Sequence, residues 1–411
     1  MRQSQHFGID VGTTKIVALA GRVEPRRRIA EVTDLGEASS RGLRRGIVVD
    51  RQAASESIWE AIESSGVKPG SATVGIAGGH INSFNTEVTL LNRGRNKVVT
   101  PRFLRRLENE ALHAVELGPD EQVIHIVPRS YTLDGEEGIR QPLGLAARRV
   151  TLRAHVISGS VQSIQNLLWA VEDCGVRVSE VVLEPLAASE SCLTEAERDM
   201  GVALLDIGGG TTDIAVFWRG ALTHTAVLPL GGQSLSSDAA FGLKVPFEIA
   251  ERLKIRYGTV LSTTVDTFAA VKAKDRHYNA HFLSQILEYR GREILEMARD
   301  SLDKARVRNF LTGGAVLTGG GSLLDGMTEL TEDILDLRAR LAAPRRVRGR
   351  IKPLQEPQYS TAVGLLYFAA KSSNLKPQHK GASATTFGSI VAAIKSWFGG
   401  GRSKMGLERR R

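Results

Sequence analysis

The fold is decided by one pattern that occurs twice, as GIDVGTTKIVAL at residues 8–19 and as LLDIGGGTTDIAVF at residues 204–217. In each copy an apolar strand ends at an aspartate, passes through a turn of glycine and threonine, and continues as a second β-rich strand. Each copy therefore predicts a β-hairpin. Because the two hairpins share one design, we expect two related halves whose turns approach a common ligand from opposite sides.

A third glycine turn lies in AVLTGGGSLLDGM at residues 315–327, where an apolar strand meets three glycines and Ser322 is expected to start a helix. Helices are predicted wherever apolar residues recur at spacings of three and four, which they do at residues 51–65, 161–174, 185–198, 245–257 and 281–305. Strands and helices thus alternate, which favours a layered α/β fold.

The region from about residue 83 to 159 differs, because four prolines divide it into short predicted strands such as Gln122–Val127 and Val150–Ile157. We interpret it as an inserted small α+β subdomain. The segment at 371–386 is polar and poor in apolar residues, which is the composition of a linker.

Composition excludes several classes of protein. With 411 residues, 42% hydrophobic and 24% charged, the chain is expected to form two to four folded units. Its two cysteines are too few for a disulfide framework or a thiolate zinc site. No apolar run is long enough to cross a membrane, and the first residues do not resemble a signal peptide, so we expect neither a membrane span nor secretion.

The net charge of +9 is concentrated in short basic runs at 26–28, 345–352 and 402–411. These runs lack interleaved aromatic residues and any recognition-helix signature, so nucleic acid is not expected as a partner.

The glycine turns predict a nucleotide site. Backbone N–H groups and threonine hydroxyls in such turns can cradle a triphosphate, and Asp10 and Asp206 occupy corresponding positions from which two carboxylates could hold a hydrated Mg²⁺. Either turn alone is also a common tight turn, but the pair together with the third turn favours nucleotide binding. The spacing matches neither a P-loop nor a Rossmann fingerprint.

These motifs resemble the actin, sugar kinase and chaperone ATPase superfamily, and within it the bacterial FtsA cell-division proteins. The more specific signals are SSRGLRRGIVVD at 39–50, VLEPLAASESCL at 182–193, LPLGGQSLSSDAAFGLKVPFEIAERLK at 228–254 and YSTAVGLL at 359–366. The resemblance implies an α/β, actin-like two-lobed ATPase fold of duplicated ribonuclease-H-like domains, with an inserted subdomain and a C-terminal amphipathic helix.

The resemblance also implies a division of the chain. The expected parts are a first-lobe core (IA) at 1–82, 161–195 and 346–370, the inserted subdomain (IC) at 83–160, a second-lobe core (IIA) at 196–230 and 301–345, a IIB subdomain at 231–300, a linker at 371–386, an amphipathic helix at 387–398 and a basic tail at 399–411.

Site residues follow from the same resemblance, with ATP and Mg²⁺ as cofactors. Residues expected at the phosphates are Asp10, Gly12, Thr13, Thr14 and Lys15 from the first turn, and Gly208, Gly209, Gly210, Thr211 and Thr212 from the second, with Gly231 and Gly232 closing over them. Glu251 and Lys254 are expected at the ribose and adenine, and Gly319, Gly320, Gly321 and Ser322 along the adenine. Asp206 is expected to orient metal-bound water, and Glu184 to place a carboxylate near the metal or the attacking water. We expect at most a slow ATPase.

The end of the chain predicts membrane attachment. A single stripe of bulky residues is formed by Phe387, Ile390, Val391, Ile394, Trp397 and Phe398, with basic residues around it. Such a helix fits the surface of an anionic membrane and binds weakly as one copy, so a filament of many copies would gain by avidity.

The function implied is that of an ATP-binding protein that polymerises and tethers the tubulin-like FtsZ ring to the inner face of the cytoplasmic membrane at the division septum. Arg290 matches a position expected to meet the acidic FtsZ tail, and the inserted subdomain is expected to bind further division proteins. Two alternatives stay open: a pilus-assembly adaptor of similar fold, and a small-molecule kinase of the same superfamily.

Overall fold

The computed structural model describes residues 5–24, 29–273, 276–349 and 352–374. The predicted amphipathic helix, with Phe387, Ile390, Val391, Ile394, Trp397 and Phe398, and the basic tail lie outside these residues. Within them, no helix is both long enough and apolar enough to span a bilayer.

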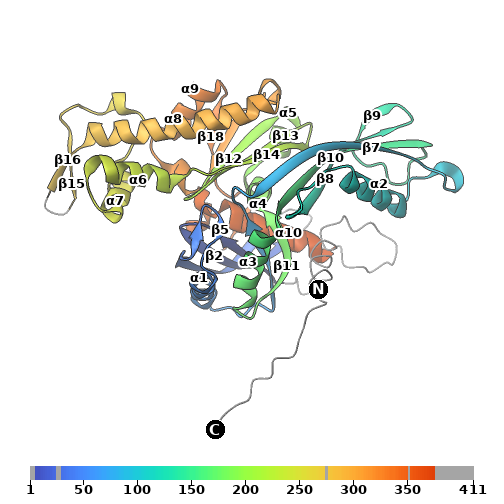
Figure 1. Ribbon diagram of the computed structural model, residues 1–411, viewed down its shortest axis with the longest axis horizontal. Coiled ribbons are helices and arrows are strands. Elements are labelled where there is room, and N and C mark those ends of the chain that lie inside the picture. The colour runs from blue at the N-terminus through green and yellow to red at the C-terminus, as the bar shows by residue number, and fades with distance from the viewer. Residues whose placement is uncertain (1–4, 25–28, 274–275, 350–351, 375–411) are drawn as a thin grey trace, which may run out of the picture.

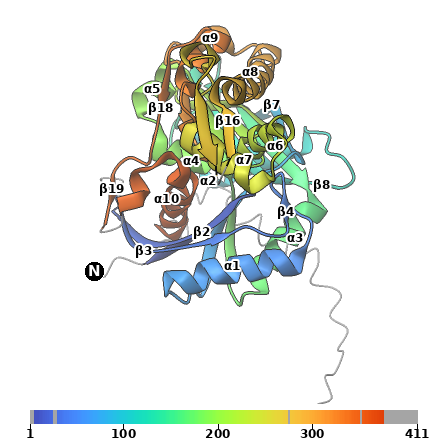
Figure 2. The same ribbon diagram turned by 90° about the vertical axis from the view of Figure 1, so that its left-hand side faces the viewer.

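The first lobe is built on a six-stranded sheet in the order β11-β6-β1-β2-β3-β19. Its strands are β1 (His6–Val11), β2 (Lys15–Glu24), β3 (Ile29–Ser39), β6 (Ser71–Ile76), β11 (Arg177–Leu183) and β19 (Val347–Arg348). Helices α1 (Arg51–Ser65) and α3 (Val161–Glu172) pack on one face, and α4 (Glu184–Cys192) and α10 (Ser360–Asn374) lie on the other. A short hairpin of β4 (Leu43–Arg44) and β5 (Ile47–Val48) precedes α1 (Figure 2).

The second lobe repeats this plan in a five-stranded sheet, β14-β13-β12-β17-β18. Its strands are β12 (Val202–Ile207), β13 (Thr212–Trp218), β14 (Ala221–Leu228), β17 (Ala315–Thr318) and β18 (Ala339–Leu341). Around it lie α5 (Glu195–Met200), α6 (Gly232–Leu243), α7 (Phe247–Tyr257), the hairpin β15 (Ala270–Ala273) and β16 (Arg276–Asn279), α8 (Ala280–Lys304) and α9 (Met327–Leu335).

The predicted duplication is confirmed by strand pairing. In the first lobe β1 pairs antiparallel with β2 and parallel with β6, and in the second β12 pairs antiparallel with β13 and parallel with β17. Both central strands are almost fully buried, as their continuous apolar runs require. The two glycine turns therefore leave equivalent ends of two equivalent sheets.

The inserted subdomain is a four-stranded sheet, β7-β10-β8-β9, covered by α2 (Pro101–His113). Its strands are β7 (Ile81–Leu91), β8 (Glu121–Leu133), β9 (Glu136–Ile139) and β10 (Arg149–Ser160). It lies beside the second lobe (Figure 1). The His155 ring joins the two, with Nδ1 at 2.9 Å from Asn85 Oδ1 and Nε2 at 3.0 Å from Thr225 Oγ1.

Three local predictions were wrong. The helix expected at 185–198 is two helices, because Thr194 and Glu197 form a capping box that starts α5 afresh. The third glycine turn continues as a 3₁₀ turn at Gly320–Leu323, so α9 begins at Met327 rather than at Ser322. Strand β8 continues past the predicted end at Val127, because a change of register beside Pro128 accommodates its missing N–H without ending the strand.

Candidate functional site

The glycine turns of both lobes line one cleft of about 620 Å³. The β1–β2 turn forms one wall, the β12–β13 turn faces it, and the loop after β17 closes one end. Most of the residues predicted for the site line this cleft: Asp10, Gly12, Thr13, Thr14, Lys15, Glu184, Asp206, Gly208, Gly209, Gly210, Thr211, Gly232, Glu251, Lys254, Gly319, Gly320 and Gly321.

The two hairpin turns touch each other. A methyl group at Gly210 would lie 2.6 Å from Thr13 Oγ1, and one at Gly209 would collide with the Thr14 side chain. Thr13 is itself fixed, because its Oγ1 accepts a hydrogen bond from the Gly46 N–H at 3.0 Å. Glycine is therefore required where the two lobes meet, for close approach of the two chains.

Four carboxyl groups gather at the base of this contact. Burial, followed by the charge of Asp206, raises the pKa of Asp10 to about 7 although Lys15 opposes the shift. Burial raises the pKa of Asp206 to about 6, against a hydrogen bond from Thr361. Burial together with the neighbouring carboxylates holds the pKa values of Glu184 and Asp213 well above their usual range. The surroundings of these carboxyl groups thus disfavour their negatively charged forms.

This chemistry fits a divalent cation. Asp213 is 3% exposed, and its Oδ1 has no hydrogen-bond partner among the residues that the structure describes, whereas its Oδ2 accepts from Thr211 Oγ1 at 3.0 Å. A cation would neutralise the cluster and satisfy that oxygen. Across the part of the chain that the structure describes, no three His, Cys, Asp or Glu side chains are arranged to ligate a metal directly. The predicted arrangement, with water between the carboxylates and Mg²⁺, does not require such a group.

The opposite end of the cleft is lined by α6 and α7 and by the loop after β17. Lys254 Nζ donates to the Gly232 carbonyl at 3.0 Å and to Glu251 Oε2 at 2.9 Å, and the same carboxylate accepts from Ser236 Oγ. Glu251 and Lys254 are therefore held facing the glycine loop.

Three predicted residues do not line the cleft but shape it. Thr212 is buried and its hydroxyl donates to the Leu230 carbonyl at 2.9 Å, Ser322 Oγ donates to the Gly319 carbonyl at 2.6 Å, and Gly231 sits where any side chain would strike the Gly208 carbonyl. The hydroxyls of Thr212 and Ser322 each donate to a backbone carbonyl, so they stabilise the loops of the site and do not face the cleft.

Two basic residues predicted to bind ligands, Lys15 and Arg290, already form ion pairs within the chain. Lys15 Nζ lies 3.2 Å from Glu37 Oε1 and 3.9 Å from the centre of the Tyr359 ring. Arg290 on α8 pairs through Nε with Asp238 Oδ2 at 2.6 Å and also contacts Glu293. Their roles at a phosphate and at an acidic peptide stay predictions.

The sequence analysis missed Asp213 and Thr361. Asp213 follows the two threonines of the second turn, and a third aspartate so close to Asp206 was a signal that could have been used. Thr361 lies 155 positions from Asp206 in the chain, and nothing local indicates that its hydroxyl donates to Asp206 Oδ2 at 2.9 Å.

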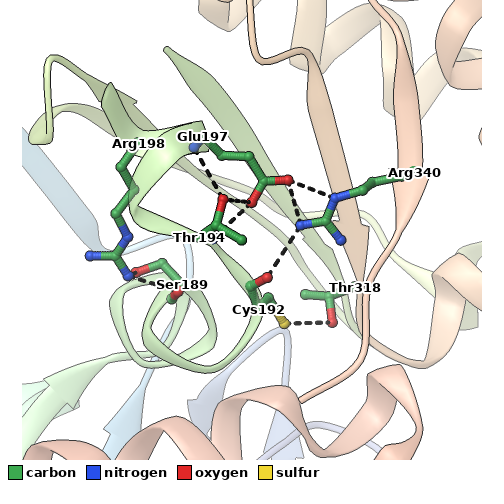
Figure 3. A network of polar contacts seen from close by, with 7 residues as sticks. All are labelled: Ser189, Cys192, Thr194, Glu197, Arg198, Thr318 and Arg340. Carbon is green, nitrogen blue, oxygen red and sulfur yellow. Dashed lines mark hydrogen bonds and ion pairs between the residues drawn. The ribbon is translucent and has the colours of Figure 1, made fainter. Parts of the chain in front are cut away.

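Figure 3 shows a polar network that joins the end of α4 to strands β17 and β18 of the second lobe. Arg340 from β18 donates to the Cys192 carbonyl at 3.2 Å and to Glu197 Oε1 at 2.7 Å, and Cys192 Sγ lies 3.6 Å from Thr318 Oγ1. This network fastens the end of α4 to the second-lobe sheet. Since Glu184 begins α4, it also fixes the helix that carries this carboxylate.

The duplicated sheets around a glycine-lined cleft define the class of actin-like ATPase folds. A similar arrangement is found in the structure of a PilM-PilN type IV pilus biogenesis complex, with a TM-score of 0.67 and 17% identity over 90% of this chain and 99% of that one. It also occurs in MreB5 of Spiroplasma citri bound to ADP, with a TM-score of 0.54 and 13% identity over 90% and 98% of the two chains. At these identities the likeness concerns the fold alone.

Closer relatives are found by sequence. The chain is 36% identical to the cell division protein FtsA of Pseudomonas aeruginosa over 96% of this chain and 97% of that protein, and 34% identical to that of Neisseria meningitidis over 97% and 99%. The family model for cell division protein FtsA matches residues 203–364, and that for the SHS2 domain inserted in FtsA matches residues 78–158. The chain belongs to the FtsA family of cell division proteins.

Proposed function

We propose that this protein binds ATP with Mg²⁺ between its lobes, self-associates into filaments, and tethers the FtsZ ring to the inner face of the cytoplasmic membrane at the division septum. One observation carries the nucleotide part: two equivalent glycine turns meet above four carboxyl groups in a single cleft, and two of these groups, Asp206 and Asp213, are buried. Such a cleft suits a triphosphate with its counter-ion.

Different residues along the cleft bind different parts of the nucleotide. Backbone N–H groups of the two turns and the hydroxyls of Thr13 and Thr14 bind the phosphates, while Glu251 and Lys254 bind the nucleoside. Asp10 and Asp206 hold Mg²⁺ through water, with Glu184 close by. When bound, Mg²⁺ neutralises triphosphate charge and polarises the terminal phosphate.

Filament formation and membrane binding reinforce each other in this proposal. ATP favours the closed arrangement of the lobes because the triphosphate contacts both turns at once. The stripe at Phe387, Ile390, Val391, Ile394, Trp397 and Phe398 then binds the anionic leaflet, and the filament multiplies a weak attachment.

FtsZ is proposed to bind near Arg290 through its acidic tail. The guanidinium is already paired with Asp238 at 2.6 Å and with Glu293, so an incoming carboxylate competes with these partners. Further division proteins are proposed to bind the inserted subdomain.

Liposome co-sedimentation tests the proposal. The full chain and a chain truncated before Phe387 are mixed with anionic vesicles, with and without ATP and Mg²⁺, and binding of a fluorescent ATP analogue is measured for both. We expect equal nucleotide binding, and sedimentation of the full chain alone. Equal sedimentation of both chains would overturn the membrane part, and failure of both to bind ATP would overturn the nucleotide part.

A further inference from the structure

A second hollow lies between the inserted subdomain and the second lobe, away from the nucleotide cleft. It consists of a cavity of about 400 Å³ and an adjoining one of about 280 Å³, which share Arg129, Trp218 and Thr223. The larger cavity also contains Arg140, Arg153 and Arg219, so four arginines line one space. Its acidic lining residues are Glu137 and Asp199, which leaves an excess of positive charge.

Arg129 is directed into this hollow by an irregularity of strand β8. Arg153 of β10 pairs with Ser130, and the next residue, Ala154, pairs with Pro128, so Arg129 is the extra residue of a bulge. Bulges redirect a side chain that regular pairing would place elsewhere. The bulge places Arg129 among residues of both the second-lobe sheet and the end of α8.

The other arginines of the inserted subdomain in this hollow are paired. Arg153 lies 2.7 Å from Glu87 and 3.6 Å from Glu137, and Arg140 lies 2.7 Å from Asp199. Arg129 has no ion pair with any residue that the structure describes, and its Nε is buried without a hydrogen-bond partner. Burial and the charge of Arg153 lower its pKa. Arg129 is half-buried, so its guanidinium has lost part of its water and can gain from an anion that pairs with it.

The adjoining cavity has a different character. Besides Arg129, Asn85 and Arg306, its lining includes the apolar side chains of Val216, Val307, Phe310 and Leu311. The Phe310 ring lies 4.8 Å from that of Trp218. A side chain of Leu or Phe size can be buried there. The Arg219 guanidinium lies 4.4 Å from the Trp218 ring and is exposed at the rim.

We propose that this hollow binds an acidic peptide of a partner protein, with one carboxylate paired to the fork of Arg129 and a neighbouring apolar side chain in the cavity beside Phe310. The planar guanidinium matches a carboxylate bidentately. A peptide fits better than a multiply charged phosphate, because Glu137 and Asp199 repel dense negative charge and the side chains of Val307, Phe310 and Leu311 can pack against an apolar side chain of a peptide. This inference rests on the proposed function in one respect, namely that the inserted subdomain binds a partner protein.

Fluorescence anisotropy with the full chain tests this directly. The probe is a fluorescein-labelled hexapeptide, Gly-Asp-Phe-Asp-Leu-Gly, and the control probe carries Asn in place of both Asp residues. We expect the acidic probe to bind at least tenfold more tightly than the amide probe, and to bind less tightly as salt increases.

Variants locate the site. Arg129→Gln is expected to weaken binding of the acidic probe at least tenfold, whereas Arg105→Gln, on the exposed face of α2 in the same subdomain, changes it less than twofold. Because Arg129 lacks an ion pair, Arg129→Gln is expected to keep or raise the melting temperature. If that variant does not fold, Arg129→Lys replaces it, with an expected loss of at least threefold since an ammonium lacks the fork.

The proposal is overturned if the acidic and amide probes bind equally, if the acidic probe fails to bind, or if folded Arg129 variants bind it like the unchanged protein. Binding of ATP is measured on the same samples. Normal ATP binding with loss of peptide binding separates failure of this site from failure of the nucleotide cleft.

Discussion

The Thr361 hydroxyl donates a hydrogen bond to Asp206 Oδ2 at 2.9 Å, joining the first turn of α10 in the first lobe to the end of β12 in the second. This bond favours the charged form of Asp206 and so opposes the effect of burial on its pKa. The position of α10 is therefore coupled to the charge at the base of the nucleotide cleft.

Replacing Thr361 with Val is expected to raise the pKa of Asp206 and to weaken Mg²⁺-dependent ATP binding about three- to tenfold at pH 7.5. The lost hydrogen bond corresponds to about 1 kcal/mol. Titration calorimetry between pH 6 and 8 checks this, and the defect should grow as pH falls. Thr331→Val is the control, because Thr331 is also buried but donates to the Met327 carbonyl of its own helix. Equal losses in both variants would show a packing effect.

Removing one carboxylate from the cluster is expected to stabilise the empty protein. The pKa of Asp10 is about 7 against an ordinary 3.8, so between these values the folded chain keeps a proton that the unfolded chain releases. Stability is therefore lost as pH rises through this window. Glu184→Gln removes one of the interacting charges, and the free energy of unfolding at pH 7.5 without metal should rise by about 1–3 kcal/mol.

Thermal unfolding in the presence of a chelator, from pH 5 to 8, measures this effect. The matched control is Glu180→Gln. Glu180 is also buried, with a pKa raised by burial to about 7, but it lies on β11 and accepts from Ser372 rather than facing the cleft. Both variants should flatten the pH dependence, and only Glu184→Gln should reduce the stabilisation by Mg²⁺ and ATP. A Glu184→Gln protein still stabilised as strongly by Mg²⁺ and ATP would exclude Glu184 from the site.

A methyl group at Gly210 is expected to force the two hairpin turns apart. Gly210→Ala places Cβ against the Thr13 side chain, which the Gly46 N–H holds in position, so the lobes must separate. We expect ATP affinity to fall at least tenfold and stability to fall by about 1–3 kcal/mol, as in other overpacked sites. The control is Gly70→Ala, whose methyl group meets open space. An ATP affinity within twofold of the unchanged protein would contradict the proposed contact.

The parts of this site that can be predicted from the sequence are those formed by residues close together in the chain. The hairpins around Asp10 and Asp206 follow from contiguous apolar runs and small-residue turns, and α1 occupies Arg51–Ser65 as its spacing indicates. The Asp206–Thr361 hydrogen bond joins residues far apart in the chain, so the spacing of apolar residues cannot predict it. The bulge at Arg129 is similar, because Pro128 indicates an interruption but not that the strand continues with one side chain redirected.

Lys254 tests which end of the cleft holds the nucleoside. Its ammonium bonds to the Gly232 carbonyl and to Glu251, and its side chain is 11% exposed. Lys254→Met leaves Glu251 without this cation, and we expect ATP and ADP affinities to fall by the same factor of about ten, or about 1.4 kcal/mol. Gly210→Ala should instead affect ATP more than ADP, since it alters the phosphate end. Lys304→Met, at the exposed end of α8, is the control for lost surface charge. If Lys254→Met weakened ATP alone, the ammonium would contact the terminal phosphate and the nucleotide would lie in the opposite direction.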